Sequence, residues 1–204
     1  MNTVSFNNSL IYPSKVVCIG RNYVEHVHEL GNEIPDEMVI FVKPNSAIGT
    51  VLSASHGGDE LHYESEIAYL YQGGNFVAAA LGMDLTKRSV QSELKAKSLP
   101  WERSKAFDGL AVFSVFVPIS GCDTPLGLSL HIDGELIQQG DTSLMMYKPA
   151  QILEEVQTFM QLEDGDIVMT GTPAGVGKIC QGAEFVGALV CNDQEVVSQR
   201  WVVE

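Results

Sequence analysis

Leu61-His62-Tyr63-Glu64-Ser65-Glu66-Ile67-Ala68-Tyr69 places two glutamates one residue apart at the start of an apolar run. Such a run predicts a β-strand, in which side chains two positions apart lie on the same face with Cα atoms roughly 6.5 Å apart. Two carboxylates that close repel each other unless a proton or a cation lies between them. The pair therefore indicates a cation site, although glutamates on an exposed strand face explain it equally well.

A third carboxylate, Asp84, ends the next apolar run, just before Leu85-Thr86-Lys87-Arg88. Taken alone, Asp84 is typical of a residue that caps a helix. Taken with Glu64 and Glu66, it predicts a magnesium site, because three carboxylates that give one oxygen each leave about half of an octahedral shell open for water or substrate.

The composition predicts one globular domain over residues 1–204, with 45% hydrophobic and 19% charged residues. A formal net charge of −14 argues against nucleic acid and anionic membranes as partners. This negative charge also opposes capture of an anionic substrate, so a metal and a few placed cations must reverse the electrostatic field locally.

No apolar run approaches the ~20 residues of a membrane helix. Four dispersed cysteines and the lack of a leader pattern predict a reduced, cytoplasmic location.

Short runs rich in Val, Ile, Phe and Tyr predict a mainly β (α+β) class with a few short helices. The expected strands are residues 16–19, 39–42, 67–71, 76–81, 110–117, 128–132, 136–138, 167–169, 185–190 and 196–203. Asp133-Gly134 predicts a two-residue hairpin. Helical spacing predicts helices over residues 149–162, 86–97 (with Thr86 as cap) and 23–30, the last one short, with little apolar face and therefore mobile.

Four further features are candidates for chemistry. His26 and Glu29 are one helical turn apart, where a carboxylate can orient an imidazole that activates water, although a solvated polar helix explains them too. Lys105 is either a surface lysine or a cation for an oxyanion. Gln91 lies one turn from Arg88 on the helix expected after Asp84, where an ordinary position on the helix surface also explains it. Residues 171–177 fail the P-loop pattern, and they are either a tight turn or a loop whose amides and Thr172 hydroxyl hold a substrate carboxylate.

The order and spacing of the chain's motifs resemble those of the fumarylacetoacetate hydrolase family. Within that family, the chain is similar to the short, single-domain branch that hydrolyses acylpyruvates and processes oxaloacetate. The resemblance covers nearly the whole length. The motifs that carry it are Cys18-Ile19-Gly20-Arg21-Asn22-Tyr23, Phe41-Val42-Lys43-Pro44, His62-Tyr63-Glu64-Ser65-Glu66, Gly82-Met83-Asp84-Leu85-Thr86, Arg88 with Gln91, Lys105 with Phe107, and Gly165-Asp166-Ile167-Val168-Met169-Thr170-Gly171-Thr172-Pro173.

The resemblance implies mixed sheets rolled around the active site, usually in a homodimer, and Mg²⁺ or Mn²⁺ on Glu64, Glu66 and Asp84. It implies that His26 and Glu29 form a catalytic, water-activating pair on a lid at about residues 23–36, and that Lys105 is catalytic as well. It also implies that Arg21, Gln91 and Thr172 bind substrate. The family often has Asp where this chain has Ser89, which removes a supporting hydrogen bond.

The expected reaction is hydrolytic C–C cleavage of a 2,4-diketo acid (an acylpyruvate). His26, held by Glu29, would deprotonate a water that attacks C4, and a pyruvate enolate would leave, with Lys105 at the oxyanion. Oxaloacetate decarboxylation, keto–enol tautomerisation and isomerisation of a dienoic diacid use the same site. A metal-binding protein without turnover is the remaining alternative.

Overall fold

The computed structural model describes residues 1–204 and is mainly β, as the sequence predicts. Its strands are β1 (Val4–Phe6), β2 (Ser9–Ile11), β3 (Lys15–Gly20), β4 (Val39–Pro44), β5 (Ile48–Gly49), β6 (Ser55–His56), β7 (Asp59–Glu60), β8 (His62–Tyr63), β9 (Ser65–Gln72), β10 (Asn75–Asp84), β11 (Ala111–Phe113), β12 (Val117–Pro118), β13 (Gly127–Ile132), β14 (Glu135–Asp141), β15 (Ile167–Met169), β16 (Gly177–Lys178), β17 (Glu184–Cys191) and β18 (Gln194–Val202). The helices are α1 (Val24–Glu29), α2 (Arg88–Ala96), α3 (Glu102–Lys105) and α4 (Pro149–Phe159), with a 3₁₀ turn, η1, at Asn45–Ala47.

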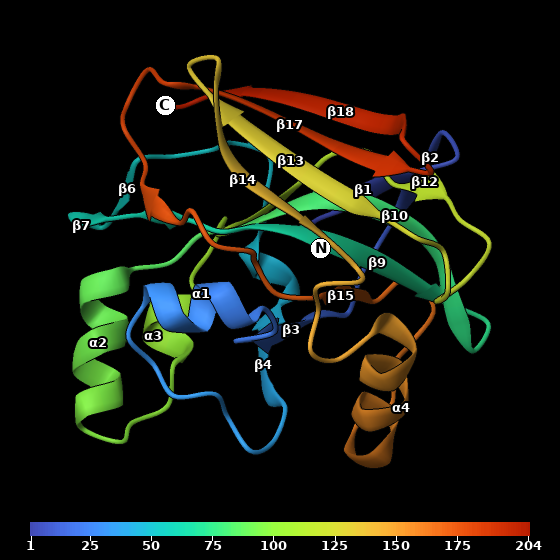
Figure 1. The fold of residues 1–204 in the computed structure, drawn as a ribbon, viewed down its shortest axis with the longest axis horizontal. Coiled ribbons are helices and arrows are strands. Elements are labelled where there is room, and N and C mark those ends of the chain that lie inside the picture. Colours follow the sequence, from blue (N-terminus) through green and yellow to red (C-terminus); the bar gives the residue numbers. More distant parts are fainter.

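Two sheets form the body of the molecule (Figure 1). The larger has eight strands in the order β4-β3-β15-β9-β10-β11-β5, with β12 also paired to β10. The smaller is antiparallel, in the order β14-β13-β17-β18, and it lies across β9 and β10. Helices α1, α2 and α3 gather at one end of the larger sheet, on the left of Figure 1, and α4 lies apart from them. None of the helices combines the length and hydrophobicity that crossing a membrane requires.

The main core lies between the two sheets, which approach closely at Gly187 of β17. A Cβ placed there would lie 2.0 Å from Leu81 Cδ2 of β10, so any larger residue would force Leu81 to move. Next to this contact, Tyr63 and Phe185 pack edge to face with ring centroids 5.3 Å apart. This packing of the small sheet on β8 to β10 fixes the part of the chain that carries the acidic residues.

The expected hairpin at Asp133-Gly134 is confirmed, because both residues have positive φ, at 51° and 86°, between paired strands β13 and β14. All three expected helices are present but shorter. The helix expected over residues 86–97 begins at Arg88, and Thr86 does not cap it, because the Thr86 backbone pairs with His62. The short helix α3 was not predicted from the sequence pattern.

The single strand expected over residues 110–117 is wrong, since the segment breaks into β11 and β12. Gly82 opposes Phe113 and Ala79 opposes Val117, so this segment has one residue more than β10 across the break. Ser114 fills the gap by accepting a hydrogen bond from the Leu81 amide through its hydroxyl, at 3.0 Å. The extra residue turns Val115 outward, where it is 51% exposed.

Candidate active site and metal site

Three buried carboxylates meet where β9 and β10 pair. Glu66 is on β9 opposite Gly82, Asp84 is the last residue of β10, and the Asp84 amide donates to the Glu64 carbonyl at 2.8 Å. Glu64 lies in the one-residue gap between β8 and β9, and not within a continuous strand as expected. One oxygen from each carboxylate lies within 4.8 Å of the other two, which suits the coordination sphere of a divalent cation.

Two buried lysines approach the same carboxylates. Lys105, at the end of α3, donates to Asp84 Oδ2 at 2.7 Å, to Glu64 Oε2 at 2.8 Å and to Thr86 Oγ1 at 2.6 Å. Lys43, on β4, donates to Asp84 Oδ1 at 2.7 Å and to the Lys105 carbonyl at 2.7 Å. The sequence analysis gave Lys43 no role in the site, although a lysine inside the apolar strand Phe41-Val42-Lys43 is a signal that could have found it.

The three carboxylates have different electrostatic surroundings. Burial opposes ionisation of Glu64, but Lys105 and Arg88, which pairs with its other oxygen, hold the pKa of Glu64 far below its usual range. Glu66 has no cation partner and accepts only the Gly171 amide, at 2.7 Å. Burial, with Asp84 and Glu64 nearby, raises the pKa of Glu66 well above its usual value. A divalent cation fits this set of residues, because it would satisfy the one carboxyl that no lysine or arginine neutralises.

His26 and Glu29 of α1 form a hydrogen-bonded pair, with His26 Nδ1 3.2 Å from Glu29 Oε2. The other oxygen of Glu29 accepts from the Gly175 amide at 2.9 Å, which fixes the carboxylate. His26 is buried and lines the same cavity as the three acidic residues, with its second ring nitrogen not engaged by Glu29. The helix is less polar on its inner side than expected, since Val27 and the preceding Tyr23 are also buried.

This cavity has a volume of only about 30 Å³ and also brings together the expected substrate-binding residues Arg21, Gln91 and Thr172. The expectation that the amides of residues 171–177 hold substrate is wrong for Gly171 and Gly175, because these amides donate to Glu66 and Glu29. The loop therefore positions the protein's own carboxylates. Sequence reasoning did not find three further residues at this site, Lys95 and Trp101 in the cavity wall and Gln138 behind Thr172.

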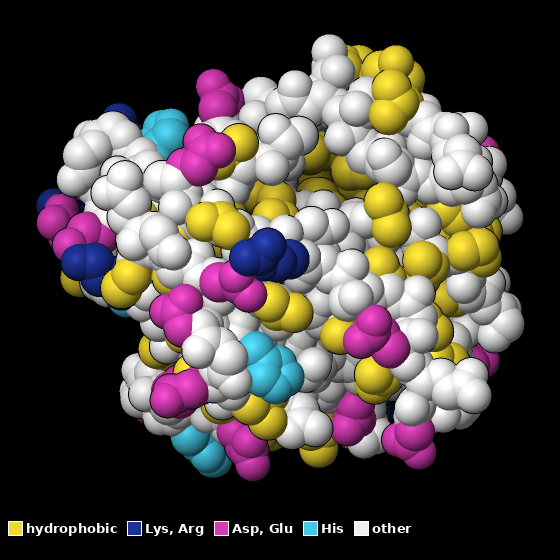
Figure 2. Space-filling model, turned by 90° about the horizontal axis from the view of Figure 1, so that it is seen from above, with side chains coloured by type: hydrophobic (Ala, Val, Ile, Leu, Met, Phe, Trp, Pro, Cys, Tyr) yellow, Lys and Arg dark blue, Asp and Glu magenta, His cyan; other side chains and the backbone are white.

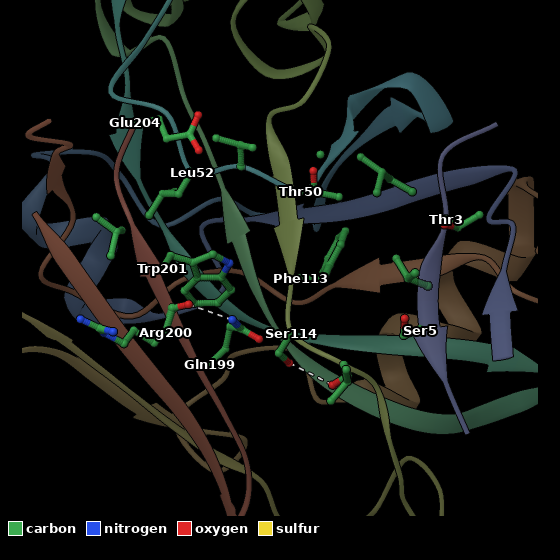
Figure 3. Close-up of a pocket in the computed structure, with 16 residues that line it drawn as sticks. Thr3, Ser5, Thr50, Leu52, Phe113, Ser114, Gln199, Arg200, Trp201 and Glu204 are labelled. Carbon is green, nitrogen blue, oxygen red and sulfur yellow. Dashed lines mark hydrogen bonds between the residues drawn. The ribbon is translucent and has the colours of Figure 1, made fainter. Parts of the chain in front are cut away.

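A larger cavity, of about 430 Å³, lies away from these residues among β1, β5, β11 and β18 (Figure 3). Its lining is a mixture of apolar and small polar side chains, with Trp201 and Phe113 facing it. Its two charged residues are Arg200, which pairs with Glu184, and Glu204. Without a cluster of titratable groups it offers no catalytic chemistry, and the smaller cavity is the candidate active site.

Acidic side chains also dominate the outside of the molecule. Figure 2 shows Asp and Glu spread over one face with few Lys and Arg among them, as the net charge of −14 requires. The cations in the candidate site are therefore a local exception to the charge of the whole protein.

The family model for the fumarylacetoacetate (FAA) hydrolase C-terminal domain matches residues 15–200. An oxaloacetate tautomerase of Escherichia coli is 37% identical over 195 residues, covering 86% of this chain and 89% of that protein. A mitochondrial oxaloacetate tautomerase of Bos taurus is 37% identical over 205 residues, covering 93% of this chain and 91% of the relative.

Solved structures agree with this similarity. A crystal structure described as a fumarylacetoacetate isomerase/hydrolase from Oleispira antarctica has a TM-score of 0.91 at 33% identity, covering 100% of both chains. Fumarylpyruvate hydrolase from Pseudomonas aeruginosa, in complex with Mn²⁺ and pyruvate, has a TM-score of 0.88 at 28% identity, covering 99% of this chain and 95% of that one.

Proposed function

This chain belongs to the fumarylacetoacetate (FAA) hydrolase family, and from this premise we propose that it is a divalent-metal-dependent enzyme that interconverts the keto and enol forms of oxaloacetate. The relatives named oxaloacetate tautomerases support the choice of substrate. The observation that carries the proposal is that one small cavity is lined by three buried carboxylates, a buried ammonium group and a carboxylate-held imidazole.

Glu64, Glu66 and Asp84 would hold Mg²⁺ or Mn²⁺. The Mn²⁺ complex of the related fumarylpyruvate hydrolase supports this assignment without deciding between the two metals. When bound, the cation supplies Lewis-acid polarisation of the 2-oxo group.

The proton transfer would be carried out by His26. Glu29 holds Nδ1, so Nε2 is the nitrogen that would take the proton from C3 and deliver it to the C2 oxygen to give the enol, and the same transfer in reverse would give the ketone. Each of the three N–H groups of Lys105 already donates, to Asp84, Glu64 and Thr86, so Lys105 would give up one of these bonds to donate to the oxygen on which negative charge develops. A buried ammonium group acts strongly there because little water screens it. Thr172 and Gln91 would hold the C1 carboxylate by hydrogen bonds from the hydroxyl and the amide.

Hydrolysis of an acylpyruvate is the second candidate, and the His26–Glu29 pair favours it. The same imidazole that removes a proton from carbon can remove one from a water molecule, which would attack C4 and release the enolate of pyruvate. The structural similarity to fumarylpyruvate hydrolase adds support. Decarboxylation of oxaloacetate needs no such base. Replacement of His26 should therefore distinguish decarboxylation from tautomerisation and hydrolysis.

The test compares His26→Ala with His28→Ala, an exposed histidine on the same helix. With Mg²⁺ present, the conversion of enol to keto oxaloacetate is followed by ultraviolet absorbance, and pyruvate release from acetylpyruvate and fumarylpyruvate is measured in parallel. We expect His26→Ala to slow tautomerisation and hydrolysis at least ~100-fold, to slow decarboxylation far less, and His28→Ala to change none of them.

The outcomes separate the candidates. If the unmodified protein accelerates enol conversion but releases no pyruvate from either diketo acid, hydrolysis is excluded. If it accelerates none of these reactions with Mg²⁺ or Mn²⁺, the proposed function is wrong and a metal-binding role without turnover is left.

A further inference from the structure

Two cations in the wall of the active-site cavity, Arg21 and Lys95, have no carboxylate partner. The other cations of the cavity do, because Lys105 pairs with Glu64 and Asp84 and Arg88 pairs with Glu64. The neighbouring buried lysine, Lys43, pairs with Asp84. In a protein with a net charge of −14, two unpaired positive groups beside one cavity are unusual and indicate that an anion completes them.

Arg21 is held in place while part of its guanidinium is left unsatisfied. Its backbone has a φ of 57°, a left-handed conformation that is strained for arginine. One terminal nitrogen, Nη2, donates to Asn32 Oδ1 at 3.2 Å. The Nε–H is buried and has no hydrogen-bond partner. An arginine whose Nε remains available can bind a carboxylate through its planar fork of donors.

Lys95 approaches the same place from α2. Its ammonium lies 4.8 Å from the centre of the Trp101 ring and makes no ion pair. Burial, together with the positive charges of Arg21 and Arg88, lowers the pKa of Lys95 to about 8. The two unpaired cations are therefore close enough to repel each other, and a shared anion between them would remove this repulsion.

The geometry of α2 places this pair beyond the acidic end of the cavity. Arg88, Gln91 and Lys95 are spaced i, i+3 and i+7 and lie along one face of the helix. Arg88 contacts Glu64, and at 1.5 Å per residue the Lys95 backbone lies about 10 Å farther along the axis. A ligand that meets the three carboxylates through a cation at one end can thus meet Lys95 and Arg21 at the other.

We propose that Arg21 and Lys95 form a second carboxylate site, so that the enzyme acts on dicarboxylic 2-oxo acids in preference to monocarboxylic ones. This inference rests on the proposed function, and it adds the two residues that would select dicarboxylic over monocarboxylic substrates. The C4 carboxylate of oxaloacetate would be bound here, as would the terminal carboxylate of a diketo diacid. Acetylpyruvate, which carries a neutral acetyl group instead, would leave both cations without a counterion.

Binding of two unreactive ligands tests the proposal without turnover. N-Oxalylglycine and N-methyloxamate share the same chelating end, and only the first carries a second carboxylate. With Mg²⁺ present, calorimetry should show at least tenfold tighter binding of N-oxalylglycine. Lys95→Met and Arg21→Asn, a residue type that tolerates positive φ, should each remove most of that preference and leave the affinity for N-methyloxamate unchanged.

Lys97→Met is the matched control, since Lys97 is the residue that ends the same helix, its side chain is 66% exposed, and it lies near Glu93 and does not line the cavity. It should retain the full preference. Equal affinity of the unmodified protein for both ligands would overturn the second carboxylate site while leaving the proposed function intact. Absence of Mg²⁺-dependent binding by either ligand would overturn both.

The same proposal can be tested by steady-state kinetics, in which KM is measured for oxaloacetate and for acetylpyruvate. Lys95→Met should raise KM for oxaloacetate about tenfold or more with little change in kcat, and should leave KM for acetylpyruvate unchanged if that substrate is turned over. An equal rise of KM for both substrates would show that Lys95 supports the cavity wall and does not recognise a carboxylate.

Discussion

Gln138 donates a hydrogen bond from Nε2 to the hydroxyl oxygen of Thr172 at 2.9 Å. The same amide nitrogen donates to the Pro173 carbonyl at 2.9 Å, and the amide oxygen accepts from the Ser65 backbone at 3.0 Å. The Thr172 hydroxyl in turn donates only a long hydrogen bond, of 3.4 Å, to the Pro173 carbonyl, and a ligand in the cavity could replace that acceptor. The buried Gln138 side chain thus connects Ser65, which lies between Glu64 and Glu66, with Thr172, the residue proposed to hold the substrate carboxylate.

Gln138→Glu is predicted to reverse this hydrogen bond. A carboxylate still accepts from the Ser65 amide but cannot donate to Thr172, so the hydroxyl would donate to the new carboxylate and no longer to substrate. We expect kcat/KM to fall about tenfold or more. Gln139→Glu, the exposed neighbour on the same strand, is the control for the added charge. Loss of activity that is matched in both variants, or that follows a lower Tm alone, would contradict the positioning role.

Glu66→Gln is predicted to weaken the metal site without weakening the fold. The amide keeps the size of the side chain and can still accept from Gly171, but it cannot ionise, so it cannot supply the negative charge that would bind the cation or add to the repulsion among the three buried carboxyl groups. Mn²⁺ affinity measured by calorimetry should fall at least ~100-fold. The Tm in the presence of chelator should stay the same or rise. Glu60→Gln, at an exposed ion pair with Lys178, should leave Mn²⁺ affinity unchanged, and equal effects of the two variants would exclude Glu66 as a ligand.

The fold and the acidic residues were accessible from the sequence because they depend on local patterns. Alternating and continuous apolar runs marked the strands, and a period of two placed Glu64 and Glu66 close to each other. Asp84 was added because it ends the next apolar run, and the antiparallel pairing of β9 with β10 in the structure brings it beside Glu64 and Glu66. The i, i+3 spacing of His26 and Glu29 likewise predicted the 3.2 Å contact in α1.

The remaining residues could not be identified because their environment is produced by tertiary structure. Gln138 lies on a strand of the small sheet, 34 residues before Thr172, and nothing in its neighbours marks it as buried. Lys95 reads as an ordinary helix-surface lysine until α2 packs against Trp101. The glycine-rich loop looked available for a ligand, but its amides are used by Glu66 and Glu29, which approach from distant elements.

The segment of about residues 23–36 is predicted to act as a lid that substrate closes. His26 and Asn32 reach the cavity from it, and Asn32 is held by Arg21, so the closed form depends on groups that ligand would contact. Amide exchange across residues 24–30 should slow when Mg²⁺ and oxalate are added together, and not with Mg²⁺ alone. Slow exchange in the free protein that oxalate does not alter would show that His26 belongs to a rigid wall.

The affinity for oxaloacetate is predicted to fall as the pH rises past about 8. The pKa of Lys95 is lowered to about 8, and burial is the largest cause. The positive charges of Arg21, Arg88 and Lys105 also lower this pKa, and the negative charge of Glu64 raises it. Lys95 carries its charge below this pH and loses it above, so the attraction to a second carboxylate is present below pH 8 and disappears as Lys95 deprotonates. If only the charged form binds, KM should rise about tenfold between pH 7 and pH 9.

Lys95→Met removes the titrating group and should give a KM that is already high at pH 7 and nearly independent of pH up to 9. Lys97→Met should keep the pH dependence of the unmodified protein, because Lys97 lies in solvent. Metal hydroxide formation and enzyme unfolding would change KM for every substrate, so acetylpyruvate serves as the internal reference where it is turned over. A KM for oxaloacetate that stays constant from pH 7 to 9, or a rise that persists in Lys95→Met, would show that the charge of Lys95 does not contribute to binding.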